Sequence, residues 1–211
     1  MNIKLNSGNI WITSDTHFGH KNICRSTTSW KMPDGSVPVN STRDFNNLDE
    51  MNSAIVNNIN NVVMSEDTLL FLGDWSFGGF ENIQKFYDRL VCKNIHFVYG
   101  NHDHHIENNK NNIQGLFKSV SHYLTVTTNN IKINLMHYPI SSWDGLSKGV
   151  LHLHGHCHLV GNRRFGKGKR MDVGMDGHPE FRPYNINECI KLLEDRPISS
   201  EIPSDHHLDG M

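Results

Sequence analysis

The sequence contains 211 residues, with a formal net charge of −2 and 36% hydrophobic residues. This length suits one well-packed domain, and the small net charge excludes a general attraction to nucleic acids and other polyanions. We expect a single domain over residues 1–196, followed by a loosely ordered tail over residues 197–211.

Three features of the sequence indicate the cellular compartment. No apolar run approaches the ~20 residues that a membrane helix requires. The first residues lack the basic segment and the apolar core of a secretory signal. The four cysteines have no CxxC spacing, which favours reduced thiols. We therefore expect a cytoplasmic protein with no membrane partner.

Taken in chain order, several segments combine an apolar run with a polar end, a pattern that predicts strands. They run from residue 9 to Asp15, from Leu69 to Asp74, from Ile95 to Asn101, from residue 132 to His137 and from residue 150 to His158. Residues 119–135 predict further strands, with a hairpin turn at residues 128–130. Residues 26–42 are rich in Ser, Thr, Pro and Gly and predict a loop.

Apolar residues at three- and four-residue steps predict helices between these strands. A cap at Ser41 or Thr42 precedes the first series, which comprises Phe45, Leu48, Met51, Ile55 and Ile59. A second helix is predicted at residues 83–90, and a capping box of Asn185 and Glu188 begins a third. This alternation of strands and helices predicts an α/β protein.

The polar residues at the strand ends form one candidate ligand set, because sites in α/β sheets lie at the carboxyl ends of the strands. They are Asp15, His17, Asp74, Asn101, His102, Asp103, His137, His156 and His158. Their carboxylate, amide and imidazole groups suit Mn, Fe, Zn or Ni. The set is too large for one ion, and a carboxylate that bridges two ions is typical of phosphoester hydrolysis.

In order, the motifs read DTH at 15–17, GD at 73–74, GNHD at 100–103, a single His137 in MHYP, and GHCH at 155–158. This series resembles the calcineurin-like metallophosphoesterase family over residues 10 to about 184. The segments DTHFGH and MDVGMD are similar to its small bacterial and phage members. The resemblance implies a metallophosphoesterase-type α/β/β/α sandwich of two mixed β-sheets flanked by helices.

The resemblance also implies two divalent metal ions, with Mn expected in vitro and Fe, Zn or Ni as alternatives. One ion is expected to be held by Asp15, His17, Asp74 and His158. The other is expected to be held by Asp74, Asn101, His137 and His156, so that Asp74 is the bridge.

Two further residues of the GNHD motif receive catalytic roles from the same resemblance. His102 is expected to point at the scissile phosphate and to assist the leaving oxygen. Asp103 is expected to orient the His102 ring through a hydrogen bond. A hydroxide held between the metals would attack phosphorus in line.

Other residues near the motifs are candidates for substrate contact, each with an ordinary structural alternative. His20 follows the first motif by one turn, and Trp75 stands beside the bridging Asp74. Arg163 and Arg164 belong to a basic, glycine-rich loop that could approach an anionic substrate or form a solvated hairpin tip. Arg43 and Arg182 are more remote basic candidates. His152 and His154 share a face with the metal motif and are expected to pack, as is Cys157.

These features predict a phosphodiesterase for a small phosphate ester of nucleotide type. No cap domain is visible, and no continuous basic stripe with interleaved aromatic residues marks a stable nucleic-acid partner. The alternatives are a metal-dependent nuclease, a phosphomonoesterase and, on the same fold, a non-catalytic binding scaffold. The sequence does not determine the oligomeric state.

Overall fold

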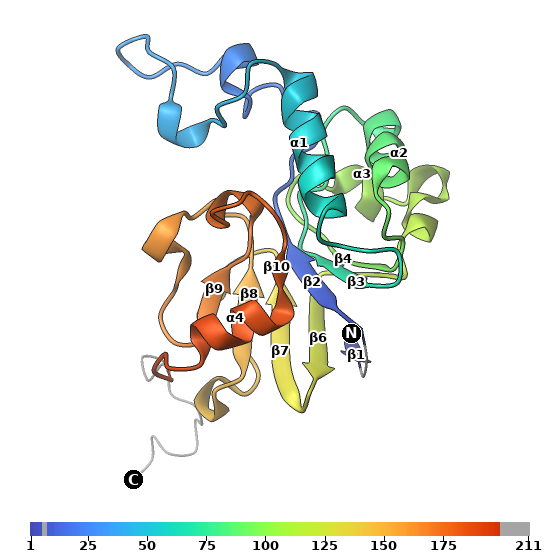
Figure 1. Cartoon of the computed structure of the whole chain (residues 1–211), viewed down its shortest axis with the longest axis vertical. Helices are drawn as coiled ribbons and strands as arrows, with labels where there is room; N and C mark the ends of the chain where they lie inside the picture. The colour runs from blue at the N-terminus through green and yellow to red at the C-terminus, as the bar shows by residue number, and fades with distance from the viewer. Residues whose placement is uncertain (6–7, 199–211) are drawn as a thin grey trace.

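The computed structural model describes residues 1–5 and 8–198. The tail expected at residues 197–211 lies, apart from its first two residues, outside the described residues. Two five-stranded sheets form the centre of the described chain (Figure 1). The first sheet has the strand order β10-β2-β3-β4-β5, and the second has the order β1-β6-β7-β8-β9.

Both sheets are mixed. In the first, β10 (Tyr184–Asn185) is antiparallel to its neighbour, whereas the others are parallel: β2 (Ile10–Thr13), β3 (Thr68–Phe71), β4 (Ile95–Val98) and β5 (Ser119–Ser121). In the second, β6 (Tyr123–Thr128) is antiparallel to β7 (Ile131–Met136). The remaining strands pair in parallel with their neighbours: β1 (Asn2–Lys4), β8 (Leu151–His154) and β9 (Arg170–Asp172).

Successive residues of β3 face two different cores, because side chains alternate across a strand. Leu69 and Phe71 belong to the core shared with α1 (Leu48–Asn60) and α2 (Phe80–Arg89), which cover one face of the first sheet (Figure 1). Leu70 belongs to a second core, which includes residues of β6, β7 and β8. The expected sandwich of two mixed sheets flanked by helices is thereby confirmed.

Shorter helices complete the fold. α3 (His104–Glu107) follows β4, and α4 (Ile186–Leu193) contacts β2, β9 and β10. The expected capping box of Asn185 and Glu188 is present at the start of α4. Short 3₁₀ segments lie at Arg25–Thr27, Val39–Ser41, Leu146–Lys148, Gly161–Arg164 and Met175–Gly177, and a longer one, kinked at Asn111 and Asn112, lies at Lys110–Leu116. Among the described residues, no helix has both the length and the apolar character needed to cross a membrane.

The start of α1 differs from the sequence expectation, whereas the predicted hairpin is confirmed. The side chain of Asn47 accepts from the backbone N–H of Glu50 at 2.8 Å and caps α1, so the expected cap at Ser41 or Thr42 is wrong. The Thr42 hydroxyl instead donates to the carbonyl of Pro38 in the preceding loop. Residues 129–130 have φ of 49° and 61°, the left-handed backbone that a tight turn between β6 and β7 requires.

Candidate metal centre

The seven predicted ligands follow the carboxyl ends of strands from both sheets. Asp15 and His17 follow β2, Asp74 follows β3, and Asn101 follows β4. From the second sheet, His137 follows β7, and the GHCH motif at residues 155–158 follows β8. The register pairs Thr13 with Phe71, which end β2 and β3, and Phe71 with Phe97, one residue before the end of β4. The candidate site therefore lies where the carboxyl edges of the two sheets meet.

The backbone at these ligands is strained. Left-handed φ values between 49° and 71° occur at five of the seven: Asp15, His17, Asp74, His156 and His158. Such a conformation costs on the order of 1–3 kcal/mol at a residue other than glycine, and it concentrates at functional sites. The surrounding structure therefore holds these side chains in positions that an ordinary strand end would not adopt.

Two glycines make the close approach of the motif loops feasible. Gly73 has φ of 87°, and a Cβ there would overlap the backbone of Gly100 and lie 2.9 Å from Nδ1 of His137. A Cβ on Gly155 would overlap the side chains of Ser14 and Asp15. A larger residue at either position would push apart two loops that carry predicted ligands.

The first group of ligand atoms surrounds Oδ1 of Asp15. This oxygen lies 3.8 Å from Nε2 of His17 and 3.8 Å from Nε2 of His158. The two imidazole nitrogens are 3.1 Å apart. Nε2 of His17 also lies 3.5 Å from Oδ2 of Asp74.

The second group surrounds Oδ1 of Asn101. This amide oxygen lies 2.9 Å from Nε2 of His137 and 2.9 Å from Nδ1 of His156. Nε2 of His137 is 3.7 Å from Oδ2 of Asp74. Oδ2 of Asp74 therefore has one ligand nitrogen of each group beside it.

These atoms fit divalent cations. Ligands that share an ion at about 2.1 Å lie roughly 3–3.5 Å from one another, close to the spacings observed. Oδ1 of Asp15 is buried and has no hydrogen-bond partner among the described residues. Burying an unpaired carboxylate oxygen is unfavourable unless a cation neutralises it. Candidate ligand groups are formed by Asp15, His17 and His158, and by Asp15, Asp74 and His137.

Burial shifts the protonation of the acids in this region. It raises the pKa of Asp15 to about 7, with a further increase from the neighbouring Asp74 carboxylate and an opposing effect from His158. It raises the pKa of Asp103 to about 6. Burial also holds the pKa of His17 well below its ordinary value, so its ring is neutral and able to bind a metal.

Hydrogen bonds fix the orientation of two ligand rings. Nδ1 of His137 donates to the carbonyl of Leu72 at 2.7 Å, and Nδ1 of His158 lies 2.7 Å from Oδ2 of Asp176. In both rings this leaves Nε2 directed at the ligand group, the usual arrangement for metal-binding histidines. Sequence reasoning did not identify Asp176 as a site residue, although it is the last residue of the MDVGMD segment.

Arg43 holds Asp176 in place. Its guanidinium donates to both carboxylate oxygens of Asp176 at 2.8 Å, and also to the carbonyls of Asp15 and Thr16. Burial alone would raise the pKa of Asp176, but Arg43 and the bond from His158 bring this pKa well below its ordinary value. Arg43 is only 7% exposed. Its guanidinium is committed to these partners and supports the candidate metal centre from behind.

The roles expected for the GNHD motif need one correction. The His102 ring is exposed, and its backbone N–H donates to Oδ1 of Asp74 at 3.0 Å. The Asp103 carboxylate is buried and accepts from the backbone N–H groups of Asp74, Trp75 and Gly100 at 2.7–3.0 Å. These three donors turn it away from the exposed ring. Asp103 therefore fixes the motif loops and does not orient His102 by a hydrogen bond.

The candidate substrate contacts divide into two groups. His20 lies at the site: its ring centre is 5.5 Å from that of His17 and 3.8 Å from that of Phe77. Burial, followed by the positive charges around it, lowers the pKa of His20 to about 4. Phe77 was not identified from the sequence, and its ring also lies 4.7 Å from that of His102.

Trp75 does not wall the site. Its side chain is 0% exposed and packs in the core against Phe71 and Phe86, with ring centres 4.6 and 4.4 Å away. Its indole N–H donates to the carbonyl of Ile83. The expected substrate contact at Trp75 is therefore wrong.

The two arginines of the basic loop differ. Arg164 donates to the carbonyl of Gly177 at 3.0 Å and lies over the rings of Phe165 and Tyr184, so it packs within the fold. This contradicts a free substrate contact at Arg164. Arg163 is exposed in the 3₁₀ turn Gly161–Arg164, and its contact with substrate stays a prediction.

The other polar residues in β8 and in the GHCH motif after it differ in burial. His152 and His154 are buried and hydrogen-bonded to backbone groups, as expected: Nδ1 of His152 to Asn134, Nδ1 of His154 to Gly155. Cys157 is exposed, contrary to the core position expected for it. The strict alternation behind that expectation stops where β8 ends at His154.

The chain is similar in sequence or in fold to several known proteins. An uncharacterized protein of Methanocaldococcus jannaschii is 28% identical over 189 residues, covering 88% of this chain and 91% of that protein. A protein of unknown function from Aquifex aeolicus has a solved structure that aligns with a TM-score of 0.61 at 21% identity, covering 88% of this chain and 100% of that chain. The structure of an archaeal phosphodiesterase aligns with a TM-score of 0.45 at 19% identity, covering 79% of this chain and 83% of that chain.

The family comparison is more specific than these individual matches. The sequence profile of calcineurin-like phosphoesterases matches residues 8–194, which includes every predicted metal ligand. The match agrees with the two mixed sheets and with the candidate metal-ligand groups at their carboxyl edges. The chain belongs to the calcineurin-like phosphoesterase family.

Proposed function

We propose that this phosphoesterase holds two divalent metal ions and hydrolyses phosphodiesters, with small nucleotide-type diesters as its substrates. The observation that carries the proposal is the position of Oδ2 of Asp74, 3.5 Å from Nε2 of His17 and 3.7 Å from Nε2 of His137. A carboxylate oxygen between two ligand groups is suited to bridge two ions. Mn is the expected ion in vitro, with Fe, Zn and Ni as alternatives.

The ions, when bound, supply positive charge to the phosphoryl oxygens and lower the pKa of bound water. The chain itself supplies a proton donor and its support. The His102 ring is exposed beside the ligands, and its backbone is tied to Asp74, so it is placed to protonate the leaving oxygen. Asp103 supports this position by binding the backbone of Asp74 and Gly100.

The preference for diesters rests on charge. A phosphomonoester carries up to two negative charges, and a diester carries one. The guanidinium of Arg43 is committed to Asp176, and that of Arg164 to the carbonyl of Gly177. Neither arginine therefore offers a free bidentate partner to a dianionic phosphate.

The test compares substrates on one metal-loaded preparation. The protein is stripped with a chelator, reconstituted with Mn, and assayed with bis-(p-nitrophenyl) phosphate and p-nitrophenyl phosphate. Cyclic nucleotides and oligonucleotides are then compared across a salt series. We expect activity only after reconstitution, faster cleavage of the diester, and turnover of cyclic nucleotides that changes little with salt.

Two outcomes would contradict the proposal in different ways. Faster cleavage of the monoester would make the protein a phosphomonoesterase. Oligonucleotide cleavage that falls steeply between low and moderate salt would reveal several phosphate contacts, and the substrate would be a nucleic acid.

A further inference from the structure

We propose that Phe77, His20 and Trp30 form an aromatic platform beside the metal centre, and that it stacks on the flat nucleobase of the substrate. This inference rests on the proposed function, because the metal centre binds the phosphate to which the base is attached. Phe77 and Trp30 were not recognised as site residues from the sequence. The platform adds a subsite for the part of the substrate that does not react.

The rings form a continuous series that begins at the reacting groups. Phe77 stacks on His17 with ring centres 5.4 Å apart and lies 4.7 Å from His102. The His20 ring meets Phe77 edge-on at 3.8 Å. Trp30 follows, with its ring centre 5.8 Å from that of His20. The series therefore leads from the proposed proton donor to an indole in an adjoining loop.

The last ring of the series is open to solvent. Trp30 is 40% exposed, and the same loop exposes Met32 at 47%. Large apolar side chains grouped on a surface beside a site are typical of ligand contacts. The loop, blue to cyan in Figure 1, stands away from both sheets, so these side chains do not contribute to either core.

The base of the loop is fixed to the metal centre. Arg25 donates from its backbone to the carbonyl of Arg43 at 2.9 Å, and its side chain pairs with Asp44 at 2.9 Å. Arg43 in turn bonds the carbonyl of Asp15 and the carboxylate of Asp176. The loop that carries Trp30 is thereby connected through Arg43 to Asp15, a predicted metal ligand. It is also connected to Asp176, which bonds the predicted ligand His158. This attachment gives the platform a defined position relative to the phosphate.

The chemistry of the rings selects the class of ligand. Stacking between a base and an aromatic side chain depends on the flat face that every base has and is tolerant of sequence. A nucleobase offers these side chains an aromatic ring to pair with, which a sugar or an alkyl chain does not. The expected substrate is therefore a phosphodiester that carries a nucleobase within reach of its phosphate.

The experiment uses two substrates that differ only in the base. They are the methyl ester of adenosine 5′-monophosphate and the methyl ester of ribose 5-phosphate, both followed by phosphorus NMR with Mn-loaded protein. The readout is the ratio of kcat/KM for the adenosine substrate to that for the ribose substrate. We expect Trp30→Ala to lower this ratio roughly 5- to 100-fold, the effect of losing one stacked base. Trp30→Phe should restore most of it.

Val39→Ala is the matched control, because Val39 lies in the same loop and is exposed but belongs to no ring series. It should leave the ratio unchanged. A wild-type ratio near one, or a ratio that Trp30→Ala leaves unchanged, would overturn the platform. A ratio that falls equally in Val39→Ala would also overturn it, because the loop and not the ring would then be responsible.

A binding measurement separates the platform from the proposed function. Adenosine 5′-monophosphate is titrated against tryptophan emission of the wild type and of Trp30→Phe. Quenching that disappears in the variant supports the platform even if neither ester is hydrolysed, in which case only the proposed function fails. Absence of quenching in the wild type, or equal quenching in both proteins, would overturn the platform.

Discussion

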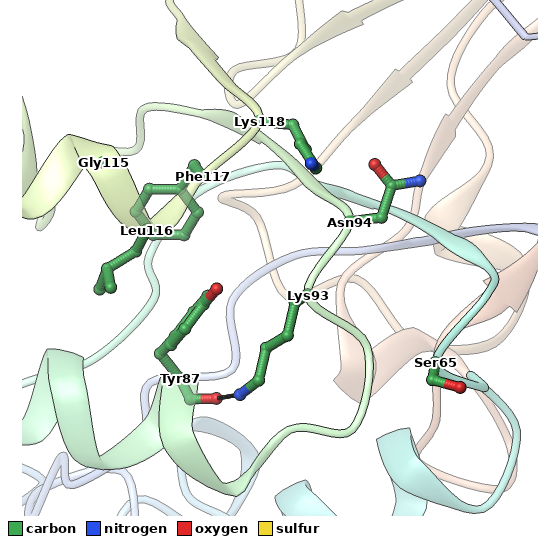
Figure 2. A pocket seen from close by; sticks show the side chains of 8 residues that line it. All are labelled: Ser65, Tyr87, Lys93, Asn94, Gly115, Leu116, Phe117 and Lys118. Carbon is green, nitrogen blue, oxygen red and sulfur yellow. Dashed lines mark hydrogen bonds between the residues drawn. The ribbon is translucent and has the colours of Figure 1, made fainter.

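The two edges of the first sheet differ in what they offer a ligand. At the amino edge, where the chain enters β4 and β5, lies a cavity of about 370 Å³ (Figure 2). It is lined by Ser65, Tyr87, Lys93, Asn94, Gly115, Leu116, Phe117 and Lys118. At the carboxyl edge lie the candidate metal ligands. This hollow therefore lies at the opposite end of the strands from the converging polar groups.

The polar groups of the two edges differ in how they are satisfied. In the hollow, the Lys93 ammonium donates a hydrogen bond to the backbone carbonyl of Tyr87 (Figure 2). Its Nζ also lies 4.2 Å from the centre of the Tyr87 ring. The Asn94 amide donates to the Thr68 hydroxyl at 2.7 Å. At the metal centre, Oδ1 of Asp15 is buried without a partner. Unsatisfied groups on a strained backbone therefore locate the site better than the hollow does.

Asp74→Asn is expected to have the largest effect, because Asp74 stands between the two ligand groups. The variant should lose bound metal and fall to the uncatalysed background on bis-(p-nitrophenyl) phosphate, roughly 10⁴-fold or more. Metal content and turnover are measured on the same sample. Lys93→Ala, in the hollow at the other edge, should change neither. Full metal content in Asp74→Asn, or loss of activity in Lys93→Ala, would contradict the assignment of the site to the carboxyl edge of the sheet.

His102→Ala is expected to separate chemistry from metal binding. Turnover should fall by roughly 10²–10⁴, the range for losing a positioned proton donor, while metal content stays near normal. His104→Ala is the matched control, since His104 is exposed two residues further along the chain. If His102→Ala loses metal, His102 is a ligand and its assignment as proton donor is wrong.

Asp176→Asn should weaken metal binding about 10- to 100-fold, the usual effect of removing the partner of a ligand histidine. The reason is its bond to His158 and its ion pair with Arg43. Mn affinity is measured by calorimetry on the chelator-treated protein. Asp144→Asn removes an exposed carboxylate that pairs with Lys132 and should leave the affinity unchanged. Equal affinities in the two variants would show that Asp176 does not support the centre.

In the metal-free protein, the stability that Asp15 contributes should fall as pH rises from about 4 to about 7. Burial raises the pKa of Asp15 to about 7, so the folded state keeps a proton that the unfolded state releases. The loss is on the order of a few kcal/mol. Relative to Asp15→Asn, the wild type should therefore lose stability in thermal unfolding as pH rises across this range. Asp103 and Asp172, whose pKa values burial raises to about 6 and about 7, act in the same direction as Asp15. The rings of His17 and His20, whose pKa values burial lowers, act in the opposite direction in both proteins.

A metal-loaded sample reverses the direction of this dependence. Ligand carboxylates must be deprotonated to bind a cation, so metal binding and the stability it adds weaken as pH falls. The same slope in loaded and metal-free protein, or an unchanged slope in Asp15→Asn, would contradict the assignment of Asp15 as a buried ligand.

The alternation of strands and helices, and the placement of the candidate ligands at strand ends, could be predicted from the sequence because both depend on short local patterns. The two-sheet sandwich was expected from the family resemblance. The DTH and GNHD motifs each follow a strand whose apolar run is visible in the sequence, and parallel strands bring their carboxyl ends together. The hairpin at residues 128–130 and the capping box of Asn185 and Glu188 are local in the same way.

The residues that were misplaced depend on backbone geometry or on distant partners. Trp75 follows Asp74, whose φ of 57° disrupts strand alternation and directs the indole into the core. The Arg43–Asp176 pair joins positions 133 residues apart, which no local pattern reveals. Asp103 was assigned to its neighbour His102, but three backbone N–H groups from other parts of the motif loops bind it instead.

Manganese stoichiometry with electron paramagnetic resonance tests the central claim most directly. The wild-type protein is loaded with Mn, and the number of ions per chain and their magnetic coupling are measured together. The position of Oδ2 of Asp74 between the two ligand groups predicts two ions per chain and an exchange-coupled spectrum, because one carboxylate would join both ions. One ion per chain, or two ions with independent spectra, would contradict a dinuclear centre bridged by Asp74.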